Sequence, residues 1–148
     1  MSSQPLLTGM RPHLNLATIC ERYILEADGS LTLFRIIDRF NVGGTTPEMP
    51  VTPISFNLIV NFRSGEFLGP LDLAINIVSP LLSAVQELRI PVNFEAPAER
   101  AVLSIGQVNL TLNEPGLYWI IVKLAEEEYT RVPLRIVYQR QPTVQTGA

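Results

Sequence analysis

Apolar side chains alternate with polar ones over much of this chain, and this alternation limits what the chain can fold into. In residues 54–63 every even position is apolar, and every odd position except Ile59 is polar. Because successive side chains of a β-strand point to opposite faces, the pattern predicts a strand with one dry face and one face in water. Residues 71–77 and 88–94 repeat it. Pro91 lies on the wet side of the last segment and has no N–H to donate, so it predicts a bulge or an edge strand.

Four more segments extend the alternation toward the C-terminus. Residues 101–105 and 108–112 alternate on either side of Gly106, which predicts two short strands with a bend or bulge between them. Residues 118–124 and 132–138 predict two further strands, each with alternate apolar residues facing the core.

The first forty residues are less regular. Residues 13–25 are expected to be extended, and the Asp28-Gly29 pair that follows is a strong turn signal. Residues 31–40 suit either a strand or an amphipathic helix. We favour a strand, because the segment follows a hairpin-type turn and is rich in β-branched and aromatic residues. Asp38 then falls on the apolar side, so either a bulge turns it outward or a polar group pairs with it.

Two segments between the expected strands contain residues that interrupt regular structure. Residues 41–53 contain several prolines and a pair of adjacent glycines, which predict a long loop. Residues 80–86 are the one place where a short helix could form, because a proline suits the first turn of a helix.

Together these segments predict about eight strands at a spacing of roughly 8–12 residues, with at most one short helix. The pattern is typical of an all-β, antiparallel sandwich and disfavours a parallel α/β sheet. A chain of 148 residues fits one domain around one hydrophobic core. We place that domain at residues 12–139, and expect residues 1–11 and 140–148 to form flexible terminal segments.

The segment from Glu114 to Tyr118 leads directly into one of the expected strands. It resembles the Asp-x-Gly-x-Tyr entry to strand F of immunoglobulin-like domains. The resemblance implies an immunoglobulin-like β-sandwich in which Gly116 and Tyr118 form a structural corner, with the Tyr118 hydroxyl bonded to the backbone a few residues upstream. Ile120 stands where disulfide-bearing members have their second cysteine, which fits a chain with one cysteine, Cys20. Such a fold does not specify a function.

Over most of its length the chain also resembles a family of small, uncharacterised, single-domain bacterial proteins. No activity is assigned to that family, so no site residue can be transferred from it. The resemblance rests on the extended segment through Cys20, the Asp28-Gly29 turn, the Leu31–Phe40 segment, Ser64-Gly65 followed by residues 71–77, and Gly116-x-Tyr118.

The composition argues against several kinds of site. The net charge is -3 and Lys123 is the only lysine, so no basic surface for nucleic acid is expected. One histidine and one cysteine cannot build a structural zinc site, and no phosphate-cradling loop or nucleophile elbow occurs. His13 and Cys20 are an odd number of positions apart on one expected strand, which puts them on opposite faces. We therefore expect a non-enzymatic protein with no catalytic residue, no cofactor and no metal.

The N-terminal segment gives an expectation about location. Its first twelve residues lack a basic region followed by a long apolar stretch, so no secretory signal is expected. No apolar run in the chain approaches the ~18 residues of a membrane helix. We expect a cytoplasmic protein without a membrane partner.

Trp119 and Ile121 are the candidate interaction residues. They are out of phase with Tyr118 on the same expected strand, so they face outward and form apolar surface that needs a cover. The cover is either another segment of the chain, such as residues 41–53, or another protein chain. Tryptophan is enriched at interface hot spots, and only 17% of the residues are charged against about 25% in typical proteins. We therefore favour a protein-interaction or assembly module whose partner is another protein chain or a second copy in a homo-oligomer.

An alternative is a domain that binds a small anion or metabolite through residues 35–53. Arg35 and Arg39 lie close to Asp38 and to the glycine-containing segment, and two guanidinium groups suit an anion. Salt bridges on the outer face of a strand would explain the same residues.

Overall fold

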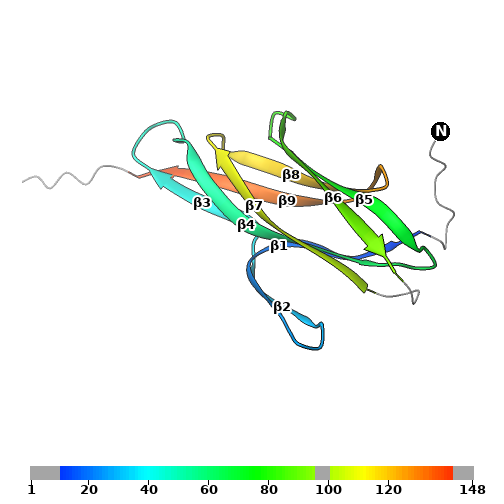
Figure 1. Cartoon of the computed structure of the whole chain (residues 1–148). Helices are drawn as coiled ribbons and strands as arrows, with labels where there is room; N and C mark the ends of the chain where they lie inside the picture. The colour runs from blue at the N-terminus through cyan, green and yellow to red at the C-terminus, as the bar shows by residue number, and fades with distance from the viewer. Residues whose placement is uncertain (1–10, 96–100, 142–148) are drawn as a thin grey trace, which may run out of the picture.

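The computed structural model describes residues 11–95 and 101–141 (Figure 1). Over these residues the chain forms nine β-strands and no helix. In chain order they are β1 (His13–Leu25), β2 (Leu31–Ile36), β3 (Arg39–Gly44), β4 (Thr52–Arg63), β5 (Gly69–Val78), β6 (Ala84–Phe94), β7 (Ala101–Leu112), β8 (Gly116–Leu124) and β9 (Glu127–Arg140).

The strands form two sheets that pack face to face, so the all-β sandwich expected from the sequence is confirmed. One sheet has the order β2-β1-β4-β7 and the other the order β3-β9-β8-β5-β6. Among the described strands, all neighbours pair antiparallel except β3 and β9, which are parallel. The expectation of a wholly antiparallel sandwich is wrong at this pair. The chain leaves one sheet after β2 and enters the other beside β9, which runs in the same direction.

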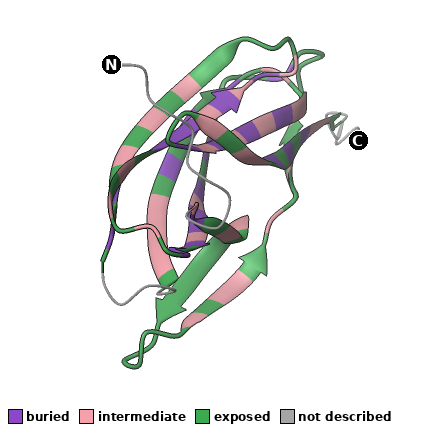
Figure 2. Ribbon diagram, turned by 90° about the vertical axis from the view of Figure 1, so that its right-hand side faces the viewer, coloured by how far each residue is buried: buried purple, intermediate pink, exposed green. Residues whose placement is uncertain are grey.

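The core lies between the two sheets and consists of the alternating apolar side chains. Ile75, Ile120 and Leu134 from the five-stranded sheet are fully buried, and so is Phe62 from the facing sheet. The Phe62 and Phe94 rings meet edge to face, with centroids 6.3 Å apart, which is a favourable arrangement for two aromatic rings. Figure 2 shows the buried residues in purple, and they lie mainly on the strands of the sandwich.

β7 differs from the prediction in its continuity and in which of its side chains face the core. Residues 101–112 form one strand whose register with β4 runs without a shift from Arg63 opposite Ala101 to Thr52 opposite Leu112. Gly106 therefore marks no bend or bulge. Even-numbered residues face the core along the whole strand, so Ser104 and Gly106 are inward and Ile105 is outward.

Residues 31–40 divide between the two sheets. β2 ends at Ile36, and β3 begins at Arg39 in the other sheet. The chain crosses between the sheets at Asp38, whose exposed carboxylate lies 3.8 Å from the Arg39 guanidinium. Asp38 thus reaches solvent because the strand ends, and it needs no buried partner.

The loop predicted at residues 41–53 is shorter than expected, because β3 includes both glycines. A Cβ on Gly44 would lie 2.6 Å from the Tyr138 hydroxyl oxygen. That hydroxyl donates a hydrogen bond of 2.6 Å to the Thr46 carbonyl oxygen. Gly44 is therefore explained by the close approach of Tyr138 from β9 and not by a turn.

The possible helix at residues 80–86 is not formed: residues 80–83 lie in a tight turn between β5 and β6, and residues 84–86 belong to β6. The ends of the turn are joined by three hydrogen bonds between Ser79 and Ser83, one of which runs from the Ser79 N–H to the Ser83 carbonyl oxygen at 2.9 Å. Leu82 takes a left-handed backbone conformation, with φ of 62°. β6 itself lies at the edge of its sheet, as Pro91 predicts.

The faces of His13 and Cys20 also differ from the prediction. The pairing of β1 with β4 shifts between Leu14 and Leu16, which changes the phase of the alternation. His13 is paired with Arg63 and Cys20 with Asn57, so both point to the outer face. Six residues of β4 separate the two pairs, a distance of roughly 20 Å, and a Cys–His pair is excluded.

The predicted terminal segments lie mostly outside the described residues. Within the described part, Arg11 is tied to the body by an ion pair of 2.6 Å with Glu127, and β9 extends to Arg140, one residue past the predicted domain boundary.

Candidate interaction site

Trp119 and Ile121 lie side by side on the outer face of the five-stranded sheet. They belong to β8, the central strand of that sheet, and both are half-buried. Trp119 is flanked by Val78 of β5 and Pro133 of β9, and Ile121 has Arg131 of β9 beside it. Neighbouring strands therefore cover part of each side chain, and part of each stays open to solvent.

Gly116 and Tyr118 hold the entry to β8. The Tyr118 side chain is 1% exposed, and its hydroxyl donates a hydrogen bond of 2.7 Å to the Glu114 carbonyl oxygen. Gly116 has φ of 133°, and a Cβ there would lie 2.7 Å from Cγ of Pro80. Burial, and to a lesser extent the charge of Glu114, raises the pKa of Tyr118. These contacts position a strand end and provide no binding group.

A more exposed apolar surface lies on a hairpin that we call the arm, residues 21–36 of β1 and β2. The arm projects away from the sandwich in both views (Figures 1 and 2). None of its residues is buried. Leu25 is 55% exposed and Ile36 65% exposed, whereas Trp119 is not among the strongly exposed apolar residues. Sequence reasoning did not identify this element as a candidate site.

The arm owes its shape to local hydrogen bonds at its tip. The Asp28 carboxylate accepts a 2.9 Å hydrogen bond from the Ser30 N–H, and this bond lowers the pKa of Asp28. Gly29 takes φ of 90°, which glycine adopts without strain. The Glu26 N–H donates to the Ser30 carbonyl oxygen at 2.7 Å and closes the turn. The arm is thus a regular hairpin whose order at the tip comes from its own residues.

Toward the tip of the arm, one face carries only apolar and aromatic side chains, and the Glu21–Arg35 ion pair lies at the base of the arm. Tyr23 is opposite Leu33, and Leu25 is opposite Leu31, and residues opposite each other share a face. We call these four residues the arm face. The reverse face is mixed, because there the Arg22 guanidinium stacks over the Phe34 ring at 5.1 Å from its centroid.

The signal for this surface is present in the sequence. Residues 23–25 and 33–34 are apolar at consecutive positions, so neither strand of the hairpin has a fully polar face. Such a strand needs a cover on both sides. A two-stranded hairpin provides no cover, but the sequence alone does not show that no other strand packs against it.

The structure does not gather Arg35 and Arg39 into one anion-binding site. Arg35 lies on the arm and pairs with Glu21 at 3.2 Å, whereas Arg39 lies past the crossing point and pairs with Asp38. Each guanidinium therefore already has a carboxylate partner, and residues 41–44 belong to a strand.

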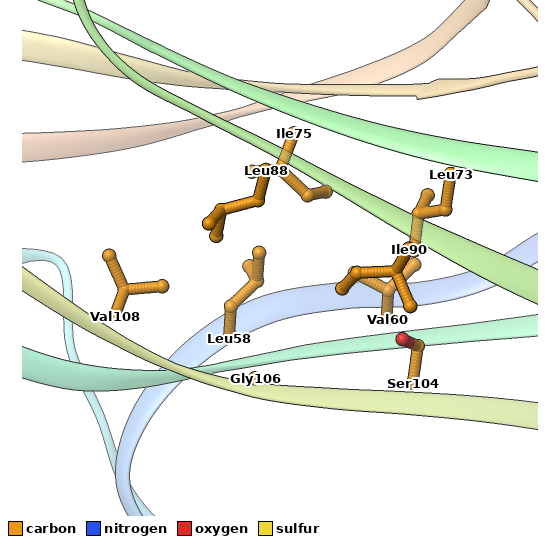
Figure 3. Close-up of a pocket in the computed structure, with 9 residues that line it drawn as sticks. All are labelled: Leu58, Val60, Leu73, Ile75, Leu88, Ile90, Ser104, Gly106 and Val108. Carbon is orange, nitrogen blue, oxygen red and sulfur yellow. The ribbon is translucent and has the colours of Figure 1, made fainter.

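The space between the two sheets offers no room for a metabolite at the cavity drawn in Figure 3. Its volume is about 10 Å³, close to the minimum for one water molecule. Ser104 and Gly106 of β7 have small side chains, and this is why the packing is incomplete there. The other lining residues are apolar: Leu58, Val60, Leu73, Ile75, Leu88, Ile90 and Val108.

The described residues offer few side chains that could act as a nucleophile or bind a metal ion. Cys20 is fully buried although it lies on the outer face of its sheet, and this burial raises the pKa of its thiol. In residues 11–95 and 101–141 no three His, Cys, Asp or Glu side chains gather in a way that could hold a metal ion. The same residues include no helix of the length and apolar character needed to cross a membrane.

Comparison with known proteins gives a family and a set of distant folds. A model of DUF6941, a family of unknown function, matches residues 15–137, which run from β1 into β9. No protein with a curated description matches the sequence.

Several solved structures are similar to this chain at low sequence identity and with TM-scores below 0.5. The Pseudomonas fluorescens alkylpurine DNA glycosylase AlkC, bound to DNA containing an abasic site analog, has 12% identity and a TM-score of 0.49; the match covers 87% of this chain but only 32% of the glycosylase. An immunoglobulin-like protein from Pseudomonas aeruginosa has 11% identity and a TM-score of 0.42, covering 86% of this chain and 98% of that one. The CARDB domain of a Pyrococcus furiosus protein, solved with di-metal ions, has 12% identity and a TM-score of 0.43, covering 90% and 95%. These similarities give no information about what this chain binds.

Proposed function

The chain belongs to DUF6941, a family of unknown function, and on that premise we propose that it is a non-enzymatic protein-interaction module that associates with copies of itself. The proposal includes a cytoplasmic location, and neither nucleic acid nor a membrane as partner. No activity comes from the family, so the proposal rests on the surface of the chain.

The observation that carries the proposal is the exposed arm face. Four large side chains from two paired strands lie together on it, and none is buried. Exposed apolar surface in a contiguous patch marks protein-interaction sites more often than scattered apolar residues do. A second copy is a suitable partner because the four residues of the arm face carry no charge, and the Glu21 and Arg35 charges at the base of the arm are paired with each other.

The outer face around Trp119 is a second surface that supports the proposal. Its half-exposed indole is rigid and amphipathic, the kind of group that anchors interfaces. It ranks below the arm because Val78 and Pro133 on neighbouring strands already flank it.

The experiment is a measurement of mass in solution by size-exclusion chromatography with light scattering. We expect the native chain to run as an oligomer. The double variant Leu25→Gln/Leu31→Gln should lose the contact between arm faces and shift to a smaller species. The matched control is Leu81→Gln/Leu82→Gln, which makes the same change at two leucines 77% and 78% exposed on the β5–β6 turn. We expect the control to retain the native mass.

The proposal fails if the native chain is strictly monomeric at high concentration. Trp119 fluorescence gives a second readout, because an emission maximum typical of a fully buried indole would remove the support that this residue lends.

A further inference from the structure

The free edge of β7 is the least protected among those of the four strands that end the two sheets. β7 closes the four-stranded sheet, and within residues 11–95 and 101–141 its one ladder partner is β4. Its opposite side therefore presents a row of backbone N–H and C=O groups with no strand beside it. Such a row is a template for pairing with another chain.

The three other edge strands carry features that discourage such pairing. β6 has Pro91 together with Glu87 and Arg89, and β2 and β3 are only six residues long, with Arg35 and Arg39 respectively. Short length, charge and proline are the usual protections of an edge. β7 has none of them: it is 12 residues long, in unbroken register with β4, and the one described strand without a charged residue or a proline.

Gly106 in the middle of β7 has no explanation within one copy of the chain. Its φ is not in the left-handed region, and a Cβ added there would meet no atom within 4 Å. Glycine inside a strand destabilises it relative to alanine. The Cβ position of Gly106 faces the space between the two sheets, so this open space lies just inside the free edge of β7.

We propose that β7 pairs antiparallel with β7 of a second copy, so that two four-stranded sheets join into one continuous sheet. Antiparallel pairing of identical strands is the arrangement that a two-fold axis generates. Near the axis each residue lies close to its own symmetry mate, so a charged strand would place like charges together. Absence of charge along β7 removes that penalty, and we place the axis near Gly106, so that Gln107 lies close to its own symmetry mate.

The pairing would also cover apolar surface on both faces of the edge. Leu103 and Ile105 are half-exposed on the outer face of the sheet. On the inner side, Leu88 and Ile90 of β6 are half-exposed around the space over Gly106, as Figure 3 shows. A second sheet edge beside β7 would bring apolar side chains to both groups.

This inference rests on the proposed self-association but uses a surface separate from the arm. If each surface forms its own two-fold contact, the native chain assembles into a species larger than a dimer. Loss of the arm contact then leaves dimers joined through β7.

The test uses the full chain with Leu25→Gln/Leu31→Gln as the parent, studied by sedimentation velocity over a range of concentrations. Gln107 is exposed on the outer face of β7 next to Gly106, so a charge there does not disturb the core. We expect the parent to be a dimer, and Gln107→Lys or Gln107→Glu to raise its dissociation constant at least about tenfold. We expect an equimolar mixture of the Lys and Glu variants to dimerise again, because opposite charges then meet. The control is Gln139→Lys on β9, which should leave the parent unchanged.

The outcomes separate the two proposals. A native chain that associates while the parent is monomeric overturns the β7 contact and leaves the proposed function standing. Equal dissociation constants for the parent, both charged variants and their mixture also overturn the β7 contact. A native chain that is monomeric throughout overturns both proposals.

Discussion

The sandwich body and the arm are made from similar residues and have opposite relations to solvent. In the body, Ile75 and Ile120 are 0% exposed because a second sheet faces them. In the arm, Ile24 and Leu25 are 47% and 55% exposed, although they also lie in a regular antiparallel pair. The ladder of hydrogen bonds is alike in the two regions, and the difference is the absence of a facing layer on the arm.

The comparison separates two meanings of an alternating pattern. Alternation shows which side chains share a face, because that follows from the geometry of a single strand. Whether the face is covered depends on the other layer, which a single strand does not specify. The arm therefore contributes little buried apolar area to folding, and its apolar residues remain free to contact another chain.

The largest contrast is expected between truncations of the same size in the two regions. Ile120→Ala should lower the free energy of unfolding by about 2–5 kcal/mol, because it removes buried methyl groups and leaves a cavity. Leu25→Ala should change it by less than about 0.5 kcal/mol. Urea unfolding followed by Trp119 fluorescence measures both. A large loss of stability in Leu25→Ala would mean that the arm is held by the body, and the comparison would fail.

A smaller effect is expected from two glycines that lie in strands of the body. Gly44→Ala should destabilise the fold by about 1–3 kcal/mol, since the added Cβ overlaps the Tyr138 hydroxyl and breaks its bond to Thr46. Gly106→Ala should be neutral or stabilising by up to about 1 kcal/mol, because the space is open. The same urea assay compares the two variants, and equal effects would show that packing at Gly44 is not the cause of its presence.

Tyr118→Phe should lower the free energy of unfolding by about 0.5–1.5 kcal/mol, through loss of the hydrogen bond to the Glu114 carbonyl. The pKa of Tyr118 is raised in the folded state, so the folded protein holds this proton more tightly than the unfolded chain does. Its contribution is therefore fully present below the ordinary tyrosine pKa of about 10 and is lost as the pH rises above that value.

Denaturation between neutral pH and pH 11 tests the sign of this dependence. The native protein should lose stability above about pH 10, and Tyr118→Phe should lose less. Some dependence should remain, because burial also raises the pKa of Tyr129. A variant with the same alkaline slope as the native protein would contradict the assignment to Tyr118.

The smallest effect on global stability is expected at the tip of the arm. Asp28→Ala removes the acceptor of the Ser30 N–H, and should leave the urea midpoint unchanged while speeding hydrogen exchange at the Ser30 amide. The pKa of Asp28 is lowered by the same bond, so the turn should loosen as the pH falls through that folded-state value. Exchange protection at Ser30 that persists in the variant would show that the strands of the arm, and not this bond, order the tip.

Much of the sandwich could be predicted from local pattern. Residues 54–63 form a strand with the expected face inward, because each of its even-numbered apolar residues packs in the core between the sheets. Gly43, Gly44 and Gly106 were assigned to a loop and a bend, because glycine most often marks such places. The first two lie in a strand, where Gly44 is close to Tyr138, 94 residues further along the chain, and no local pattern reports such a contact.

The candidate site was predictable only in part. Trp119 and Ile121 do share an outward face, because that follows from their phase relative to Tyr118. The arm was not recognised as a surface, since residues 13–25 form one continuous strand and nothing within them shows where the sheet ends. Exposure of residues 21–25 depends on which strands lie beside β1, and that is a property of the topology.

The position of β9 has a consequence for the order in which the chain folds. β9 is the last described strand, yet it lies inside its sheet between β3 and β8. Its parallel partner β3 was synthesised nearly a hundred residues earlier, so a newly made β3 has no neighbour in its sheet until the C-terminal strand emerges. Contacts between residues so far apart in sequence slow folding. A growing chain must therefore carry an incomplete sheet through nearly all of its synthesis, and during that time the paired hairpin of β1 and β2 is the first piece able to form.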